Sequence, residues 1–385
     1  MAALASRSTI SILELGEMFR TISLITILGL GTVPCCMLHA LTPPKTNASA
    51  IEWLGALPHD EFYSARFLDI EEKNAILVTR GTVLVSRDTG LNWSSEAHVK
   101  GPKAPEGVVG AWRSSPGDLY LLSDSKSLQT GGSGLPVTMI PAYVGNRSYM
   151  DINGNTKART VIVVGARSIP VTKDRFAELP HYAQGFDATS PSMAVPIISI
   201  SNDHGRTWES VNLPKAIGYL DGVRVSDQNV VAWGPYAIFA STDGGRSWNL
   251  MTMDVPDDEE DSYPVSANIV GDQLQVSLKN GRILAGSIAR QRLSTIAHLS
   301  HALGNLTFFN ACTGFGVSSE DRPETSREED VLMETRDGGK TWNSVFRTRR
   351  IVALAAGDAE LYGASFDRMF RIHVDEATGA GSCER

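Results

Sequence analysis

The stretch Ser241-Thr-Asp243-Gly-Gly245-Arg-Ser-Trp248 decides the fold, because three close copies of it occur elsewhere in the chain. All of them fit the pattern Ser/Thr-x-Asp-x-Gly-x-x-Trp, which we call the box. Its acidic, glycine and aromatic positions are Asp88, Gly90, Trp93, Asp203, Gly205, Trp208, Asp243, Gly245, Trp248, Asp337, Gly339 and Trp342. Repeated matches to so many defined positions identify a structural repeat.

Each box predicts a turn between two strands. A short apolar run such as Ala237-Ile-Phe-Ala240 precedes it, which is typical of a strand. The Asp side chain is suited to accept hydrogen bonds from backbone N–H groups two or three residues further on. The Gly permits a positive φ, and the Trp opens the next strand with an apolar face that needs a neighbour. We therefore interpret the box Asp residues as structural rather than catalytic or metal-binding.

The spacing of the boxes predicts the number of repeats. Their Asp residues are 115, 40 and 94 positions apart, and a repeat of 40–47 residues suits a four-stranded propeller blade. Each long gap then contains one further blade with a degenerate box, around residues 118–124 and 273–286. After the last box, strands are predicted at 351–354, 360–362 and 369–374.

The ring needs one more strand, and residues 51–54 can supply it. Closing the ring with the first and last segments leaves no open sheet edge. We predict an all-β fold, a single seven-bladed β-propeller with four-stranded antiparallel blades over residues 51–385. Six or eight blades are the alternatives.

Residues 1–50 are predicted to be a signal peptide or a membrane anchor. Residues 21–44 contain no charged side chain, and the small residues that end at Ala50 suit signal peptidase, with Ala40 as a second cut. An uncleaved segment of this length can span a bilayer. We therefore expect an exported protein, periplasmic or extracellular, with membrane association through residues 21–44 if they are retained.

Two cysteines follow residue 50. Cys312 and Cys383 either pair, which an exported compartment permits, or remain two free thiols. A pair would hold the C-terminal tail against the ring.

Composition restricts the partners. The chain has 35 Lys and Arg against 43 Asp and Glu, a net charge of −8, which argues against nucleic acid. The sequence contains no His/Cys cluster at zinc spacing, no glycine-rich phosphate loop and no Gly-x-Ser-x-Gly elbow. We expect no metal and no cofactor.

Strand order predicts where a binding surface lies. The boxes join third and fourth strands and share one face, the box face. Loops between second and third strands and links between blades emerge opposite, on what we call the link face, where long loops on a rigid scaffold commonly bind partners. Three long segments are predicted there, 172–193, 254–261 and 318–330. Their candidate binding residues are Asp174, Arg175, His181, Tyr182, Asp257, Asp258, Glu259, Arg322 and Arg327.

Two of these segments have alternative interpretations. The acidic run 254–261 suits calcium in the chemistry of its side chains, but it lacks the alternating spacing of a dedicated calcium loop and also fits a solvated loop. His181 beside Tyr182 suits general acid–base work, or is an ordinary surface residue.

The boxes resemble the Asp-box, or bacterial neuraminidase repeat, of sialidases and other propellers. The unit Phe308-Phe309-Asn-Ala-Cys-Thr-Gly314-Phe-Gly-Val317, followed by the box ending at Trp342, resembles the repeat of the photosystem II assembly and stability factor propellers. That resemblance implies a non-catalytic scaffold that binds a protein partner or helps to assemble an envelope complex. No run in this chain matches the Arg-rich partner-binding patch of that family.

The sialidase resemblance supplies the alternative, a glycoside hydrolase with a carbohydrate ligand. Sialidases as a family use three arginines, a Tyr nucleophile with a Glu partner and an Asp acid/base. Their first arginine lies in a Phe/Tyr-Arg-Ile-Pro motif, whereas Arg66 here is followed by Phe67-Leu68. The nearest match, Arg167-Ser-Ile169-Pro170, carries an insertion and lies in the wrong blade. We therefore predict a protein that is not an enzyme.

Overall fold

The computed structural model describes residues 51–374 apart from short gaps, and residues 48–385 form one compact unit. The gaps are 58–66, 80, 101–106, 115–116, 124–126, 131–134, 181–182, 186–189, 212, 214–217, 256–260, 323–326, 358 and 367. The expectations for residues 1–50 and for Cys383 lie outside the described residues, whereas Cys312 is disulfide-bonded. Within the described part of the chain, no helix is long and apolar enough to cross a membrane.

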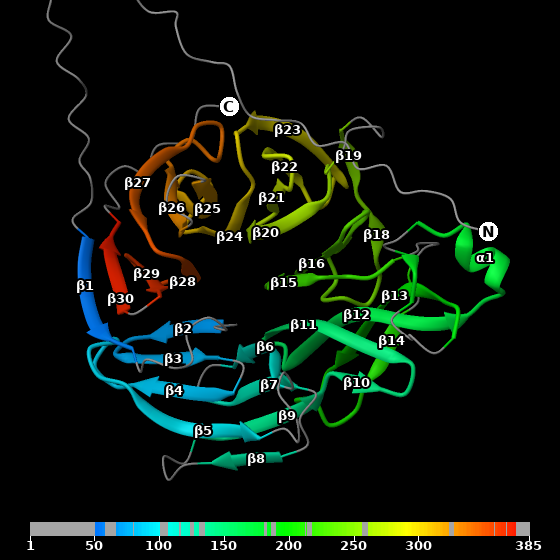
Figure 1. Cartoon of the computed structure of the whole chain (residues 1–385), viewed down its shortest axis with the longest axis horizontal. Coiled ribbons are helices and arrows are strands. Elements are labelled where there is room, and N and C mark those ends of the chain that lie inside the picture. The colour runs from blue at the N-terminus through cyan, green and yellow to red at the C-terminus, as the bar shows by residue number, and fades with distance from the viewer. Residues whose placement is uncertain are drawn as a thin grey trace, which may run out of the picture. The chain divides into compact units, whose positions relative to one another are not determined.

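The strands form seven sheets arranged as blades around a common axis (Figure 1). This confirms the predicted all-β, seven-bladed propeller. From the axis outward, blade 1 has β2 (Phe67–Glu71), β3 (Asn74–Val78), β4 (Thr82–Ser86), β5 (Ser94–Lys100) and β8 (Ser127–Thr130). Blade 2 has β6 (Val108–Arg113), β7 (Leu119–Ser123) and β9 (Val137–Pro141). Blade 3 has β11 (Arg147–Asn155), β12 (Thr160–Pro170), β13 (Ser192–Ser201) and β14 (Glu209–Val211), with β10 (Tyr143–Val144) beside β11.

The remaining blades follow the same outward order. Blade 4 has β15 (Gly222–Ser226), β16 (Asn229–Gly234), β17 (Ala237–Ser241) and β18 (Asn249–Leu250). Blade 5 has β20 (Pro264–Val270), β21 (Gln273–Leu278), β22 (Arg282–Ser287), β23 (Arg292–His298) and β19 (Thr252–Asp254). Blade 6 has β24 (Leu303–Phe308), β25 (Gly314–Arg322), β26 (Arg327–Thr335) and β27 (Asn343–Thr348). Blade 7 has β28 (Ile351–Ala356), β29 (Glu360–Ser365), β30 (Arg368–His373) and β1 (Ile51–Ala56).

Strand number varies from blade to blade around the four that the sequence predicts. Blades 4, 6 and 7 have four strands, and blades 1, 3 and 5 have a fifth. Blade 2 has three among the described residues, because after β7 the chain crosses to pair β8 antiparallel with the outer strand of blade 1. It returns as β9, which lies parallel to β7. The box-less segment therefore joins two blades.

The first and last strands close the ring as predicted. β1 pairs antiparallel with β30, with Trp53 opposite Phe370 and their rings 6.0 Å apart in an edge-on arrangement. Arg371 Nε donates to Glu52 at 3.0 Å, so an ion pair joins the two ends of the described chain. The N-terminal strand of the described chain thus supplies the outer strand of blade 7.

The core lies between neighbouring blades rather than at the axis. One cluster of buried residues joins Val231, Trp233 and Ile238 of blade 4 to Leu274 and Val276 of blade 5. The middle strands are near-continuous buried apolar runs, as in β3 and β16, because both faces of each blade pack against a neighbour. The inner strands surround the axis and carry polar residues there.

Candidate functional site

The boxes close turns, as predicted, and the Ser or Thr hydroxyl is central to each. In blade 4, Ser241 Oγ donates to Asp243 Oδ1 at 2.7 Å and accepts from Gly245 N at 2.8 Å. Trp248 Nε1 donates to Gly245 O at 2.7 Å, and Gly245 has a φ of +93°. The same three contacts recur in the other three boxes. The Trp indole thus closes the turn on the glycine that the positive φ requires.

The carboxylate contacts differ slightly from the prediction. Asp203 Oδ1 accepts from Arg206 N at 3.0 Å and from Thr207 N at 2.8 Å, and Oδ2 accepts from the Thr207 hydroxyl at 2.6 Å. The N–H groups lie three and four residues on, rather than two or three. Hydrogen bonds from Thr207 and Ser201 to the ionised form lower the pKa of Asp203 to about 2. Every carboxylate oxygen is therefore engaged within the turn, which supports a structural role.

Blade 5 rebuilds the missing box with a carboxylate from another turn. Ser287 ends the third strand, as the Ser of a box does, and its hydroxyl donates to Asp272 Oδ2 at 2.5 Å. Asp272 precedes β21, and its Oδ1 accepts from Ala289 N at 3.0 Å. The same hydroxyl–carboxylate pair thus forms between two loops of the box face.

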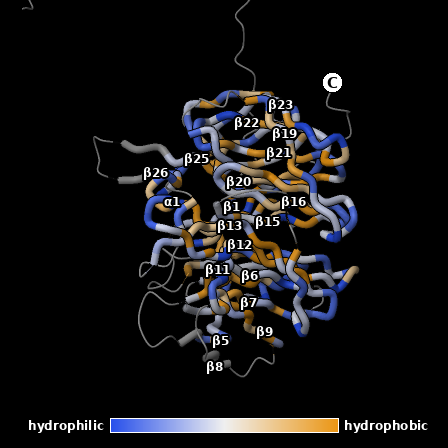
Figure 2. Tube along the Cα trace, turned by 90° about the vertical axis from the view of Figure 1, so that its right-hand side faces the viewer, coloured by the Kyte–Doolittle hydropathy of each residue, from blue (hydrophilic) through white to orange (hydrophobic). Residues whose placement is uncertain are grey.

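The predicted link-face segments contain more regular structure than loops. In 172–193, Thr172 caps α1 (Lys173–Ala177), and Arg175 pairs with Glu178 at 3.3 Å on the exposed surface. The prediction that 318–330 is a loop is wrong, because β25 and β26 continue as a hairpin to the backbone pair Arg322–Arg327. Figure 2 shows α1 and this hairpin on the same side of the molecule.

The structure tests few of the predicted binding residues. His181, Tyr182, Asp257, Asp258 and Glu259 lie outside the described residues. Asp174 and Arg175 are described and exposed, on a helix with no buried residue. For Arg322 and Arg327 only the backbone pairing is described.

A polar cavity of about 300 Å³ lies along the axis, lined by the inner strands of the blades. Its polar lining residues are Asp69, Asp151, Asn153, Arg224, Asn268, Asn305 and Thr307. Toward the box face, Arg113 pairs with Asp69 at 3.0 Å and with Glu71 at 3.2 Å, and its side chain is 10% exposed. Both carboxylates at that end therefore share one cation.

The link-face end of the cavity differs in how its carboxylates are paired. Asp151 Oδ2 accepts from Val223 N at 3.0 Å and pairs with Arg224 at 3.3 Å. Arg224 also donates to Val223 O at 2.8 Å and lies over the Trp233 ring, 5.4 Å from its centroid. Asp221 comes directly before β15, so strand direction places it at this end, and no ion pair to it occurs among the described residues. Burial and the nearby Asp151 carboxylate raise the pKa of Asp221 to about 6.

Three tyrosines surround this end of blade 4. Tyr219 lies on the link between blades 3 and 4, Tyr236 in the turn between β16 and β17, and Tyr263 just before β20. Burial raises the pKa of Tyr219, and the negative charges of Asp221 and the other two tyrosines raise it further. Tyr236 is 56% exposed. We call Tyr219, Tyr236, Tyr263 and Asp221 the mouth.

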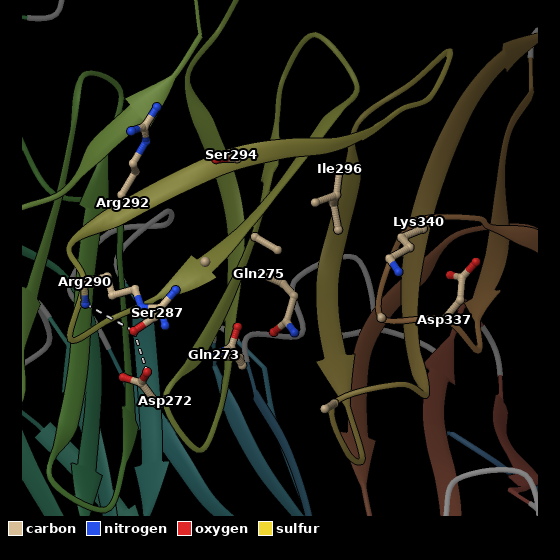
Figure 3. Close-up of a pocket in the computed structure, with 14 residues that line it drawn as sticks. Asp272, Gln273, Gln275, Ser287, Arg290, Arg292, Ser294, Ile296, Asp337 and Lys340 are labelled. Atoms are coloured by element: carbon tan, nitrogen blue, oxygen red, sulfur yellow. Dashed lines mark hydrogen bonds between the residues drawn. The ribbon is translucent and has the colours of Figure 1, made fainter. Parts of the chain in front are cut away.

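A second hollow, of about 790 Å³, lies between blades 5 and 6 (Figure 3). Asp272, Ser287 and Arg290 lie at one side of it, and Asp337 and Lys340 at the other. Gln275 points into it from β21, is 3% exposed and has a buried Oε1 without a hydrogen-bond partner. The polar side chains that line this hollow distinguish it from the apolar interfaces between the other blades.

Sequence reasoning missed the mouth and the inter-blade hollow. Asp151 and Asp221 are far apart in the chain, and only the adjacency of blades 3 and 4 brings them together. Gln275 did carry a signal, because it interrupts the apolar run Leu274-Gln-Val276. Among the residues that the structure describes, no three His, Cys, Asp or Glu side chains form a group that could hold a metal ion.

Comparison with known proteins identifies the fold. No family model and no curated protein matches the chain. A structure of YCF48 bound to D1 peptide aligns with a TM-score of 0.53 and 12% identity over 86% of this chain and 98% of that one. YCF48 from Cyanidioschyzon merolae aligns at 0.54 and 11% identity, over 84% and 99%. U3-55K aligns at 0.51 and 10% identity, over 85% and 99%. At these identities the similarity extends to the propeller fold alone.

Proposed function

We propose that this propeller is a non-catalytic scaffold that binds a protein partner through its link face, as an exported assembly or stability factor for an envelope complex. The observation that carries the proposal is the mouth, on the face that the boxes leave free. There the Asp221 carboxylate has no ion-pair partner among the described residues and lies near Tyr219, one of three tyrosines at this end. Tyrosines are enriched at protein interfaces because their rings bury large area while the hydroxyl stays hydrogen-bonded. The fold that the chain shares with YCF48 and the box repeats support the same role.

The charges along the axis favour binding over glycoside hydrolysis. A sialidase-like site needs arginines free to hold a substrate carboxylate. Arg113 and Arg224, on inner strands near the axis, are each paired with carboxylates of the protein itself. Arg147, at the start of β11, donates to Ser210 Oγ at 3.0 Å. The carboxylates Asp69 and Asp151 are engaged by the same pairs, although burial raises the pKa of both.

A pair of variants on opposite faces tests the proposal. Residues 320–329 are replaced by Asn-Gly, a two-residue hairpin turn that joins Ser319 to Asp330. This retains the contacts that anchor the hairpin, Ser319 Oγ to Asp330 Oδ1 at 2.8 Å and Ile351 N to Asp330 Oδ2 at 2.5 Å. The control is Leu91→Asp, which adds a charge at a half-exposed side chain in a box turn of the opposite face.

The measurement is affinity capture from native envelopes by the full-length protein, quantified by mass spectrometry. The short-hairpin variant, and separately Asp174→Ala with Arg175→Ala, should lose proteins that the wild type retains, and Leu91→Asp should keep them. Capture that survives both link-face changes and is lost with Leu91→Asp would place the partner on the box face and contradict the proposal.

A further inference from the structure

We propose that the mouth binds a guanidinium or ammonium side chain from a basic segment of the partner protein. This inference rests on the proposed function, because it names the chemistry by which the link face recognises its partner. It predicts recognition of Arg or Lys by a carboxylate and aromatic rings at the end of the axial cavity.

The backbone fixes Asp221 at the link-face start of β15, near Asp151, which lines the cavity. Its N–H donates to Trp233 O at 2.7 Å, and the residue before it, Leu220, is buried and donates to Gly165 O at 3.2 Å. The next residue is Gly222, where an added Cβ would lie 2.1 Å from the Trp233 ring. The chain therefore cannot shift at this point without breaking the packing of blade 4, so the backbone that carries Asp221 is held in place.

Charges around Asp221 leave it with excess negative potential. Asp151 from β11 acts on it, and Tyr219 lies near it, with Tyr236 and Tyr263 near Tyr219 in turn. Arg224 is committed to Asp151, the Val223 carbonyl and the Trp233 ring. A visiting cation would relieve the repulsion between Asp221 and Asp151 and restore a favourable charge balance.

The tyrosines make an organic cation a better fit than a metal ion. A cation over an aromatic face gains about 0.5–2 kcal/mol from the ring quadrupole, and the gain is largest where water is excluded. A calcium ion needs six to eight oxygen ligands, whereas Asp221 is the one carboxylate here without a committed partner among the described residues. A guanidinium or ammonium needs fewer contacts and tolerates aromatic neighbours.

The cavity below the mouth suits a peptide rather than a free amine. Asn153, Asn268 and Asn305 line it, and Asn268 Nδ2 is buried without an acceptor among the described residues. A peptide that brings a basic side chain also brings carbonyl groups, which can accept hydrogen bonds from asparagine amides that line the cavity. An ammonium ion alone supplies donors only.

The test measures binding of short synthetic peptides to full-length protein by NMR line shapes or calorimetry. The probe is acetyl-Gly-Arg-Gly-amide, compared with the same peptide carrying citrulline, which keeps the shape and removes the charge. At pH 7.5 the Arg peptide should bind at least tenfold more tightly than the citrulline peptide. Asp221→Asn should abolish that preference, and Tyr236→Ala should weaken the Arg peptide about threefold.

Asp227→Asn is the matched control. Asp227 is an exposed Asp at the other end of the same β15–β16 hairpin, so its substitution removes the same charge from the opposite face. It should leave both peptides unaffected, and thermal melts of all variants confirm folding. Affinity for the Arg peptide should also fall as pH drops below about 6, because Asp221 then becomes protonated.

Equal binding of both peptides, no binding of either, or an Arg preference that survives Asp221→Asn would overturn this inference. These outcomes differ from failure of the proposed function, because the capture experiment with the short-hairpin variant reads partner binding independently of the peptides. Capture that depends on the link face without an Arg preference would leave the scaffold role in place with a different recognition chemistry.

Discussion

Replacing Gln275 by valine should stabilise the propeller. Strand register aligns this residue with Val231 and Ile76, because each is the third residue of the second strand in its blade. Both of those side chains are buried in apolar clusters between blades. At the same place in blade 5, the structure has a buried amide whose Oε1 has no partner and which faces a hollow of about 790 Å³.

The magnitude follows from that unsatisfied oxygen. A buried acceptor without a partner costs about 1–3 kcal/mol. Valine removes that cost and keeps an apolar contact, but it is smaller than glutamine and enlarges the hollow, which costs part of the gain. We expect the free energy of unfolding of Gln275→Val to rise by about 1–2 kcal/mol, which corresponds to a few degrees in Tm.

Urea unfolding monitored by tryptophan fluorescence measures the effect, with an unchanged slope as the sign that the unfolded state is the same. The reciprocal variant Val231→Gln places an amide in the apolar interface of blades 4 and 5, and should lose about 2–4 kcal/mol. A loss of stability in Gln275→Val would refute the reasoning, because it would mean that the amide oxygen is hydrogen-bonded in solution by a molecule in the hollow.

Three further predictions follow from the turns and the closure. Asp203 has a folded pKa of about 2, below the unfolded value of about 3.9. The stability that its ionised form contributes is therefore present above pH 4 and is lost as the pH falls toward 2. The variant Asp203→Asn should show a smaller decline in urea midpoint over that pH range. Trp248→Phe removes the indole donor to Gly245 and should cost about 1 kcal/mol in urea unfolding. Arg371→Met breaks the pair with Glu52 and should speed amide hydrogen exchange in β1, with a stability loss of about 0.3–1 kcal/mol because the pair is partly exposed.

The fold was predictable because its signals are local and repeated. Each turn requires Ser, Asp, Gly and Trp at fixed offsets, so it can be recognised from the sequence. Ring closure could be predicted because an open sheet edge is unfavourable. The exchange of β8 into blade 1 was not predictable, because a strand this short carries no periodic signal and its partner lies in another blade. The parallel pairings of β9 with β7 and of β19 with β23 were not predictable for the same reason.

For the candidate site, the sequence allowed a prediction of the face of the propeller but not of the residues that form the mouth. Loop length marked the link face, but the charged stretch 318–330 was predicted as a loop and is instead a hairpin held at its base by Asp330. The mouth combines residues from links and turns of blades 3, 4 and 5, and no spacing along the chain brings Asp151 beside Asp221. Its chemistry depends on which inner strands are neighbours, which the ring alone determines.

The two ends of the axial cavity explain why binding is assigned to the link face. At the box-face end, the nearly buried Arg113 lies between Asp69 and Glu71, so a basic ligand would have to displace a cation that is already paired. At the link-face end, Arg224 satisfies Asp151 and leaves Asp221 without a counter-ion among the described residues. A cationic group therefore loses little by entering from the link face and would compete with an existing ion pair from the box face. The difference lies in the placement of two arginines around the ring, and the boxes specify neither of them.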